Sequence, residues 1–175
     1  MKIAVLASGN GSNFEALANT FKEEIVLLIS NKKDAHALKR AANHNIKSAV
    51  LGSDKEIVSL LKKEEIDIVL LAGYMKMLSP YFVDEYRDRI LNIHPSLLPE
   101  FPGLESINRA FEAKVGRTGV TVHLVDEGMD TGKILAQKEI VIQEDDSLES
   151  LTERIHALEH EIYQEVVRNY LPNFS

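Results

Sequence analysis

KIAVLASGNGSN, residues 2–13, combines a short apolar run at 2–7 with a glycine-containing segment at 8–13. An apolar run of this length without alternation is typical of a strand that is buried on both faces of a sheet. A helix can begin directly after the glycines, because Ser12 or Asn13 can serve as its cap. The stretch therefore predicts a strand, a tight turn and a helix, the unit from which α/β folds are built.

The same pattern recurs through the first half of the chain. Four more apolar runs predict buried strands, at 25–30, 48–51, 66–72 and 89–93. Helical patterns separate them: Asp34 starts one that runs to about Asn43, and Asp54 caps the next. Buried strands that alternate with helices predict an α/β, Rossmann-like fold, a mostly parallel sheet with helices on both faces.

The second half differs in character. Runs at 119–125 and 133–142 flank a loop and predict antiparallel strands. A C-terminal helix follows, with Asp146 at its cap and Glu149 three residues later, the spacing of a capping box. Its apolar stripe consists of Leu148, Leu151, Ile155, Leu158, Ile162 and Val166. We find no linker or repeat, and we expect residues 1–175 to form a single domain.

Composition excludes several classes of protein. The chain has 20 basic and 27 acidic residues, a net charge of −7, and no basic block, which argues against nucleic acid or an anionic membrane as a partner. It has no cysteine, which excludes disulfides and thiolate zinc sites. The N-terminal apolar run is too short for a signal peptide, and none approaches the roughly 20 residues of a membrane helix. We expect a cytoplasmic protein that acts on small molecules.

The glycine turn at 8–13 is the first candidate site, because ligands of open α/β sheets lie at the carboxyl ends of the strands. Two glycines followed by a helix N-terminus suit a phosphate group. Phe14 occupies the third glycine position of the dinucleotide fingerprint, and the second strand ends in Ser30-Asn31 without an acidic residue. These departures favour a monophosphate over NAD or ATP. A glycine turn without a ligand is the alternative.

Asn92 and His94 form the second candidate site. They are two residues apart at the end of a strand, so their side chains project from the same side. An amide that donates to an oxyanion beside an imidazole that moves protons suits acyl transfer. The alternative is a structural histidine.

The loop at 126–132, DEGMDTG, is the third candidate. By itself it reads as an acidic, solvated hairpin loop, although its two glycines could let a carboxylate approach a ligand closely.

The sequence HALEH at 156–160 matches the zinc-binding pattern H-x-x-E-H on a helix. Such a site needs a third protein ligand, and only 15 residues remain after His160. We therefore expect no metal.

Five segments together resemble the phosphoribosylglycinamide formyltransferase family, in the family's order and near its spacing. They are VLASGNGSN, IVLLAGYMKML, LNIHPSLLP, GVTVHLVDEGMDTG and LEHEIY. The resemblance implies a formyltransferase fold and the transfer of a formyl group from the co-substrate 10-formyltetrahydrofolate to the amine of glycinamide ribonucleotide, in de novo purine biosynthesis.

The resemblance also implies three groups of site residues. The catalytic trio consists of Asn92, His94 and Asp130. The ribonucleotide site consists of Gly11, Ser12 and Asn13, with His156 and Glu159. The folate site consists of Met75, Lys76, Met77, Leu78, Asn92, Asp126, Glu127, Gly128, Met129 and Asp130. The chain departs from some members in having Lys76 where they use arginine, and Lys55 does not clearly match their upstream basic residue. We expect a monomer or a weak homodimer.

Three other functions are alternatives. Methionyl-tRNA formyltransferase resembles the chain in its Asn–His–Asp chemistry, but it carries a C-terminal RNA-binding domain and lacks the phosphate turn. The folate deformylase has an extra N-terminal domain. A non-catalytic nucleotide-binding module would have no need of Asn92, His94 and Asp130 together.

Overall fold

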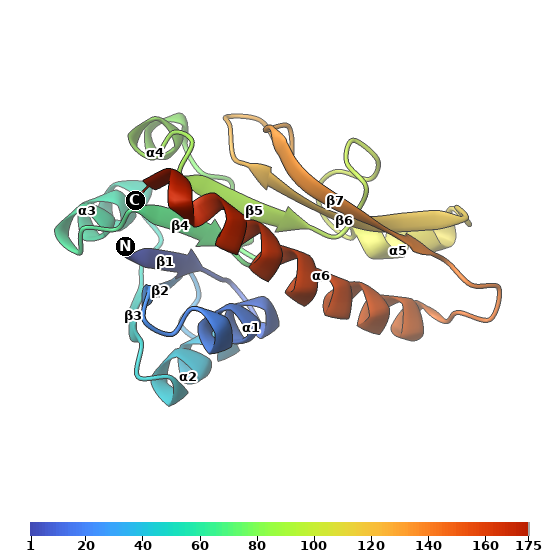
Figure 1. Ribbon diagram of the computed structural model, residues 1–175, viewed down its shortest axis with the longest axis horizontal. Coiled ribbons are helices and arrows are strands. Elements are labelled where there is room, and N and C mark those ends of the chain that lie inside the picture. The colour runs from blue at the N-terminus through green and yellow to red at the C-terminus, as the bar shows by residue number, and fades with distance from the viewer. Residues whose placement is uncertain (175) are drawn as a thin grey trace.

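The computed structural model describes residues 1–174 and places seven strands in one sheet, in the order β3-β2-β1-β4-β5-β6-β7 (Figure 1). The strands are β1 (Ile3–Leu6), β2 (Ile25–Ser30), β3 (Lys47–Val50), β4 (Ile68–Leu71), β5 (Ile90–His94), β6 (Arg117–Leu124) and β7 (Ile134–Val141). β1 to β5 pair in parallel, and β6 and β7 join β5 as antiparallel strands. The mostly parallel sheet and its antiparallel end are confirmed.

Helices cover both faces of this sheet. They are α1 (Ser12–Thr20), α2 (His36–Asn43), α3 (Asp54–Lys63), α4 (Pro80–Glu85), α5 (Ser106–Glu112) and α6 (Leu148–Tyr170), followed by the 3₁₀ turn η1 (Leu171–Phe174). One core packs α1, α2 and α6 on one face, and a second core packs α3 and α4 on the other. Every residue of β1 is fully buried between the two cores, because this strand lies in the middle of the sheet.

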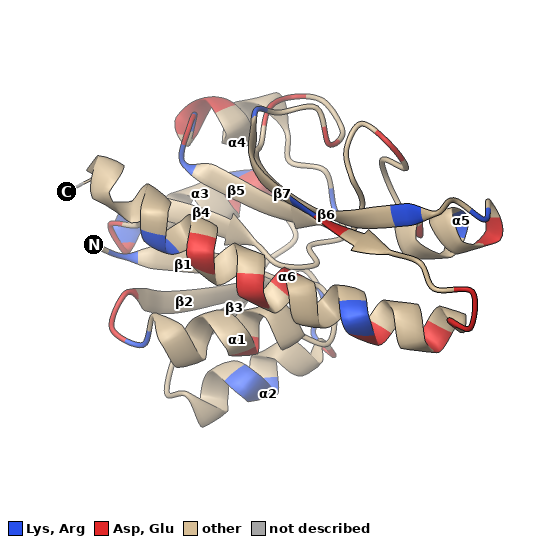
Figure 2. Cartoon of the chain, turned by 45° about the vertical axis from the view of Figure 1, so that its right-hand side comes forward, with Lys and Arg blue, Asp and Glu red and all other residues tan. Residues whose placement is uncertain are grey.

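The long helix α6 runs across one face of the sheet, from the open end of the β6–β7 hairpin, where β7 ends, back to the end where both termini lie (Figure 1). The buried hydroxyl of Tyr163 donates to the carbonyl oxygens of Leu71 in β4 and Leu91 in β5, at 2.9 and 3.1 Å. Acidic residues mark the outer side of α6 (Figure 2), and Lys138 of β7 lies 2.6 Å from Glu161. α6 is thus held over β4 and β5, and β5 is the strand that carries Asn92 and His94.

The helix caps differ from the sequence predictions. α6 begins after Ser147, whose hydroxyl accepts from the backbone N–H of Ser150 while the Ser150 hydroxyl accepts from that of Ser147. The prediction of Asp146 and Glu149 as the capping box was therefore wrong by one residue. Asp146 still supports the turn, since its carboxylate accepts from the Ser150 hydroxyl at 2.8 Å.

Three further helix starts also differ. Gly11 occupies the N-cap of α1 in the left-handed region, without a side-chain cap, in place of Ser12 or Asn13. α2 begins at His36, two residues after the predicted Asp34, and Asp54 is the first residue of α3 with Ser53 at its N-cap. None of these three helix starts has a side-chain hydrogen bond at its cap, so the identity of the polar residue alone does not fix where each helix begins.

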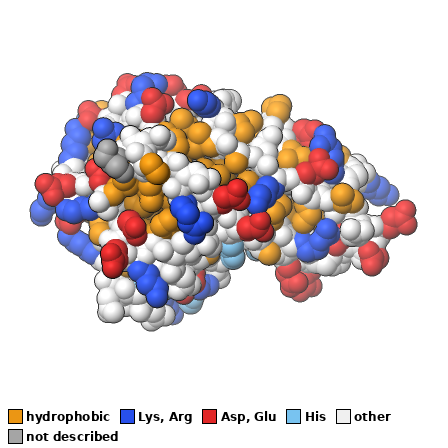
Figure 3. Space-filling model, viewed as in Figure 1, with side chains coloured by type: hydrophobic (Ala, Val, Ile, Leu, Met, Phe, Trp, Pro, Cys, Tyr) orange, Lys and Arg blue, Asp and Glu red, His pale blue; other side chains and the backbone are white. Residues whose placement is uncertain are grey.

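Charged side chains of both signs are interspersed over the surface seen in Figure 3. Among the helices described, none is long and apolar enough to cross a membrane.

Candidate active site

A cavity of about 620 Å³ opens at the carboxyl ends of β1, β4 and β5. It brings together nearly all of the residues predicted from the sequence. Those that line it are Gly11, Ser12, Asn13, Met75, Lys76, Met77, Leu78, Asn92, His94, Asp126, Gly128, Met129, Asp130, His156 and Glu159. Glu127 is not among the lining residues; its carboxylate lies 2.7 Å from Arg87 and points to the outside of the loop.

The glycine turn forms one end of the cavity. Gly11 has φ +80°, and a Cβ there would lie 2.7 Å from the Cβ of Ala37, so neither the conformation nor the space admits a side chain. α1 starts directly after it, with the N–H groups of its first turn free of helical partners. This end of the cavity presents backbone donors and the positive end of a helix dipole, as anion sites do.

Asn92, His94 and Asp130 meet in the middle of the cavity. β5 supplies Asn92 and His94, and the loop after β6 supplies Asp130. Nδ1 of His94 lies 3.6 Å from Oδ2 of Asp130. Nε2 of His94 lies 2.9 Å from the carbonyl oxygen of Phe101, which can only accept, so this nitrogen carries a proton. Nδ1 is therefore left to face the carboxylate.

His123 is a fourth member of this cluster that the sequence analysis did not single out. Its Nδ1 donates to the carbonyl oxygen of Leu124 at 2.8 Å, and its Nε2 lies 3.2 Å from Nδ2 of Asn92. A neutral His123 with its proton on Nδ1 accepts from the Asn92 amide and fixes the orientation of that amide. In the sequence, His123 stands out only as a histidine within an apolar strand. That pattern is as typical of a structural histidine as of a functional one.

The environment of Asp130 keeps it ionised. Burial by itself would raise its pKa, but contact with His123, a 2.8 Å hydrogen bond from the N–H of Gly103 and the nearby His94 outweigh burial, so the pKa lies below its ordinary value. Asp130 has φ +55°, in the left-handed region that is rare for residues other than glycine. A negative charge is thus held beside the imidazole in a strained loop.

Asp126 holds that loop in shape. Its Oδ1 accepts from the N–H of Gly128 at 2.9 Å and from the hydroxyl of Thr131 at 2.6 Å. At Gly132 a Cβ would lie 1.7 Å from the carbonyl oxygen of Leu124, so this position requires glycine. The side chain of Asp126 therefore shapes the loop that presents Asp130.

The segment 75–78 forms another wall of the cavity. Met75 and Met77 are exposed, whereas Leu78 is buried. Lys76 lies 3.0 Å from Asp54 and donates to the carbonyl oxygen of Gly52. The backbone N–H of Met75 donates to the hydroxyl of Ser8 at 2.8 Å, which joins this wall to the glycine turn.

α6 contributes His156 and Glu159. The side chain of His156 is half exposed, and its Nε2 lies 3.9 Å from Oε2 of Glu159. Burial raises the pKa of Glu159 to about 7, and its contact with Asn13 lowers the pKa by less. Within residues 1–174, no group of three or more His, Cys, Asp or Glu side chains is arranged to hold a metal ion.

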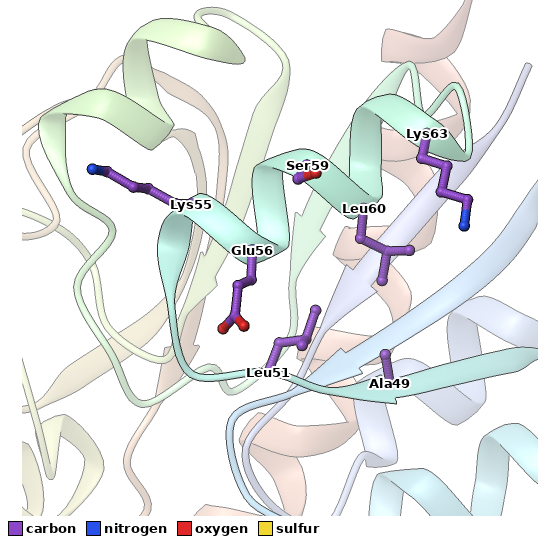
Figure 4. A pocket seen from close by; sticks show the side chains of 7 residues that line it. All are labelled: Ala49, Leu51, Lys55, Glu56, Ser59, Leu60 and Lys63. Carbon is purple, nitrogen blue, oxygen red and sulfur yellow. The ribbon is translucent and has the colours of Figure 1, made fainter.

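The sequence analysis also missed residues 103–108, at the start of α5, which line the cavity beside Asp130. Their only local signal is Gly103. Lys55, in contrast, lies on α3 and lines a separate shallow hollow with Ala49, Leu51 and Leu60 (Figure 4). That hollow contains none of the predicted site residues.

Comparisons with known proteins identify relatives of this chain. Residues 1–167 match the family described as formyl transferase. Phosphoribosylglycinamide formyltransferase of Bacillus subtilis is 44% identical over 97% of this chain and 94% of its own. The trifunctional purine biosynthetic protein adenosine-3 of Drosophila melanogaster is 43% identical over 91% of this chain, which spans 13% of that protein.

Solved structures identify relatives as well. The phosphoribosylglycinamide formyltransferase structures from Streptococcus pneumoniae and Bacillus halodurans superpose with TM-scores of 0.94 and 0.93. They are 41% and 44% identical to this chain, over 97% and 98% of it and over 98% and 95% of their own chains. The family match over most of the length and these identities lead to one conclusion: the chain belongs to the formyl transferase family.

Proposed function

We propose that this chain transfers the formyl group of 10-formyltetrahydrofolate to the amine of glycinamide ribonucleotide, giving formylglycinamide ribonucleotide and tetrahydrofolate. The observation that carries the proposal is one cavity with the Asn92, His94 and Asp130 cluster at its centre and an anion-binding helix start at one end. The relatives named phosphoribosylglycinamide formyltransferase, 44% identical in Bacillus subtilis, support the same activity.

The two substrates occupy opposite sides of the cluster in this proposal. The phosphate of the ribonucleotide binds the N–H groups of Gly11, Ser12 and Asn13, because a helix N-terminus attracts an anion. His156 and Glu159 lie beside that end of the cavity and contact the rest of the ribonucleotide. The folate lies between the wall 75–78 and the loop 126–130, where the exposed Met75, Met77 and Met129 offer apolar contacts.

The reaction begins when the amine nitrogen attacks the formyl carbon. A carbon–nitrogen bond forms, and the formyl oxygen takes the negative charge of a tetrahedral intermediate. The Asn92 amide, oriented by His123, donates a hydrogen bond to this oxyanion. Nδ1–H of a protonated His94 donates a second one, because Nε2–H is taken by the carbonyl oxygen of Phe101. Asp130 faces Nδ1 of His94 with its negative charge and stabilises the positive charge that the ring carries in this step.

Collapse of the intermediate breaks the bond between the formyl carbon and N10 of the folate. The proton lost by the amine passes to N10, and a water molecule held by Asp130 carries it. Binding both substrates together in the cavity also lowers the activation barrier, since positioning of two bound reactants contributes about 7–11 kcal/mol in favourable cases. The residues of this scheme act through hydrogen bonds and proton transfer.

A folate absorbance assay tests the proposal. Turnover of 10-formyltetrahydrofolate should require glycinamide ribonucleotide, and formylated ribonucleotide should form in equal amount. Turnover with methionyl-tRNA in its place would assign the chain to the other formyl-transferring function. Release of formate without an acceptor would indicate a deformylase, and no turnover with any acceptor would indicate a binding module. Sedimentation equilibrium tests the accompanying proposal of a monomer or weak homodimer.

A further inference from the structure

The side chain of Arg40 in α2 hydrogen-bonds to the glycine turn from outside the cavity. Its Nε donates to the carbonyl oxygen of Asn10 at 2.9 Å, and its Nη2 donates to Oδ1 of the same residue at 2.8 Å. Its third nitrogen, Nη1, lies 3.5 Å from Oε2 of Glu15 in α1. Arg40 is not among the residues that line the cavity, so it stands outside the ligand site and acts on the turn that forms it.

These contacts decide which way the peptide groups of the turn face. The peptide between Asn10 and Gly11 is trans, and in a trans peptide the C=O and N–H bonds point in opposite directions. Because Arg40 holds the Asn10 carbonyl toward α2, the Gly11 N–H points away from α2, on the cavity side. The N–H of Ala37 donates to the Gly9 carbonyl at 3.1 Å and orients the preceding peptide in the same way.

Arginine suits this role better than lysine. Its planar guanidinium can bond two acceptors of one residue at fixed angles, whereas an ammonium group acts as a point charge. The third contact, to Glu15, also matters, because Glu15 lies in the first turn of α1 and would otherwise repel an anion. His44 binds the other carboxylate oxygen of Glu15 at 3.0 Å, so two basic side chains face this charge.

We propose that Arg40 is a positioning residue for the phosphate-binding turn and sets the affinity for the ribonucleotide phosphate without touching it. The inference rests on the proposed function, because the proposed occupant of the turn is the phosphate of glycinamide ribonucleotide. It assigns Arg40 a role distinct from the general attraction of a positive charge.

The kinetic test compares Arg40→Met, Arg40→Lys and a control, Lys39→Met, which removes an exposed positive charge from the same helix. Arg40→Met should raise the KM for glycinamide ribonucleotide at least about tenfold, the scale of lost charge-assisted hydrogen bonds. The KM for folate and kcat should stay within about twofold, because the cluster around His94 is untouched. The KM of Arg40→Lys for glycinamide ribonucleotide should be close to that of Arg40→Met. The KM of Lys39→Met should be close to that of the wild type.

Two results would overturn the proposal. Recovery of the wild-type KM in Arg40→Lys would show that charge alone suffices. An equal rise of both KM values, or no rise at all, would show that Arg40 has only a general structural role or none. The riboside that lacks the phosphate gives a matched substrate, for which Arg40→Met and the wild type should have the same KM.

An NMR titration with inorganic phosphate supplies a readout that does not depend on activity. In the wild type, phosphate should shift the amide resonances of Gly11, Ser12 and Asn13. In Arg40→Lys the Gly11 amide should already be displaced and should respond at least about tenfold more weakly. An unchanged Gly11 amide with unchanged phosphate affinity would contradict the inference. A wild type that binds phosphate here but does not formylate the ribonucleotide would refute the proposed function and leave this inference standing.

Discussion

Nδ1 of His94 lies 3.6 Å from Oδ2 of Asp130, while Nε2 of the same ring lies 2.9 Å from the carbonyl oxygen of Phe101. The two contacts orient the imidazole from both sides, and Nδ1 is the nitrogen that faces the negatively charged carboxylate of Asp130. Phe101 has φ +48°, an unusual conformation for a large side chain, and so the carbonyl that positions His94 belongs to a strained segment. Strain of this kind concentrates where a site must be held in one geometry.

The phosphate end of the cavity can be tested at Ser12. Ser12→Asp places a carboxylate where the ribonucleotide phosphate is proposed to bind, and like charges repel. Ribonucleotide binding should weaken at least about tenfold, while folate binding should stay nearly intact. Calorimetric titration of each ligand measures this, with Ser12→Ala as the neutral control. Equal losses for both ligands, or no loss, would show that the phosphate binds elsewhere.

The zinc-like spacing of His156, Glu159 and His160 leads to a prediction about chelation. Glu159 is buried while His156 is half exposed, and the proposed steps rely on hydrogen bonds and proton transfer. Exhaustive dialysis against a chelator should therefore leave kcat unchanged. Stoichiometric zinc in the purified protein, with activity that disappears on its removal and returns on its addition, would support a metal site at this helix instead.

Glu159 should make stability depend on pH. Burial raises its pKa from an ordinary 4.5 to about 7, so between these values the folded protein keeps a proton that the unfolded chain has released. The contribution of Glu159 to the free energy of unfolding therefore falls as pH rises from about 4.5 to about 7, and is constant above that. Glu159→Gln removes this dependence.

Urea unfolding at pH 5 and pH 8 measures the effect. The stability of Glu159→Gln relative to the wild type should increase by about 2–3 kcal/mol from pH 5 to pH 8. Glu153→Gln, an exposed carboxylate on the same helix, should show no such increase. A difference between Glu159→Gln and wild type that is constant across this range would mean that Glu159 is ionised throughout.

The fold was largely predictable from local patterns. β2 has the predicted bounds, and the other strands differ from their predicted ranges by one or two residues at each end. α4 and α5 were missed because they are short, at 6 and 7 residues, and too brief to show helical periodicity. Ser79 followed by Pro80 is a helix-start signal that the sequence analysis did not use, and the hydroxyl of Ser79 does accept from the N–H of Phe82.

The candidate site was predictable mainly through the resemblance to a family. Asn92 and His94 could be paired from their spacing alone, but Asp130 lies 36 residues beyond His94 and reaches it only because β6 returns antiparallel to β5. His123 enters the cluster by the same pairing, since it lies opposite Asn92 in the register. Such contacts depend on strand order, which no local pattern contains. The burial of Glu159 likewise depends on how α6 packs on α1.

The most direct test of the proposed catalysis is steady-state formyl transfer by Asp130→Asn. Asparagine keeps the shape of Asp130 and removes the charge that faces His94. We expect kcat to fall at least about 100-fold, the usual scale for lost acid–base or oxyanion help, while both KM values stay within a few-fold. Asp126→Asn, in the same loop, is the comparison: it should alter the folate KM far more than kcat, because Asp126 only shapes the loop. A near-normal kcat in Asp130→Asn with a raised folate KM would contradict the account and reduce Asp130 to a loop-shaping residue.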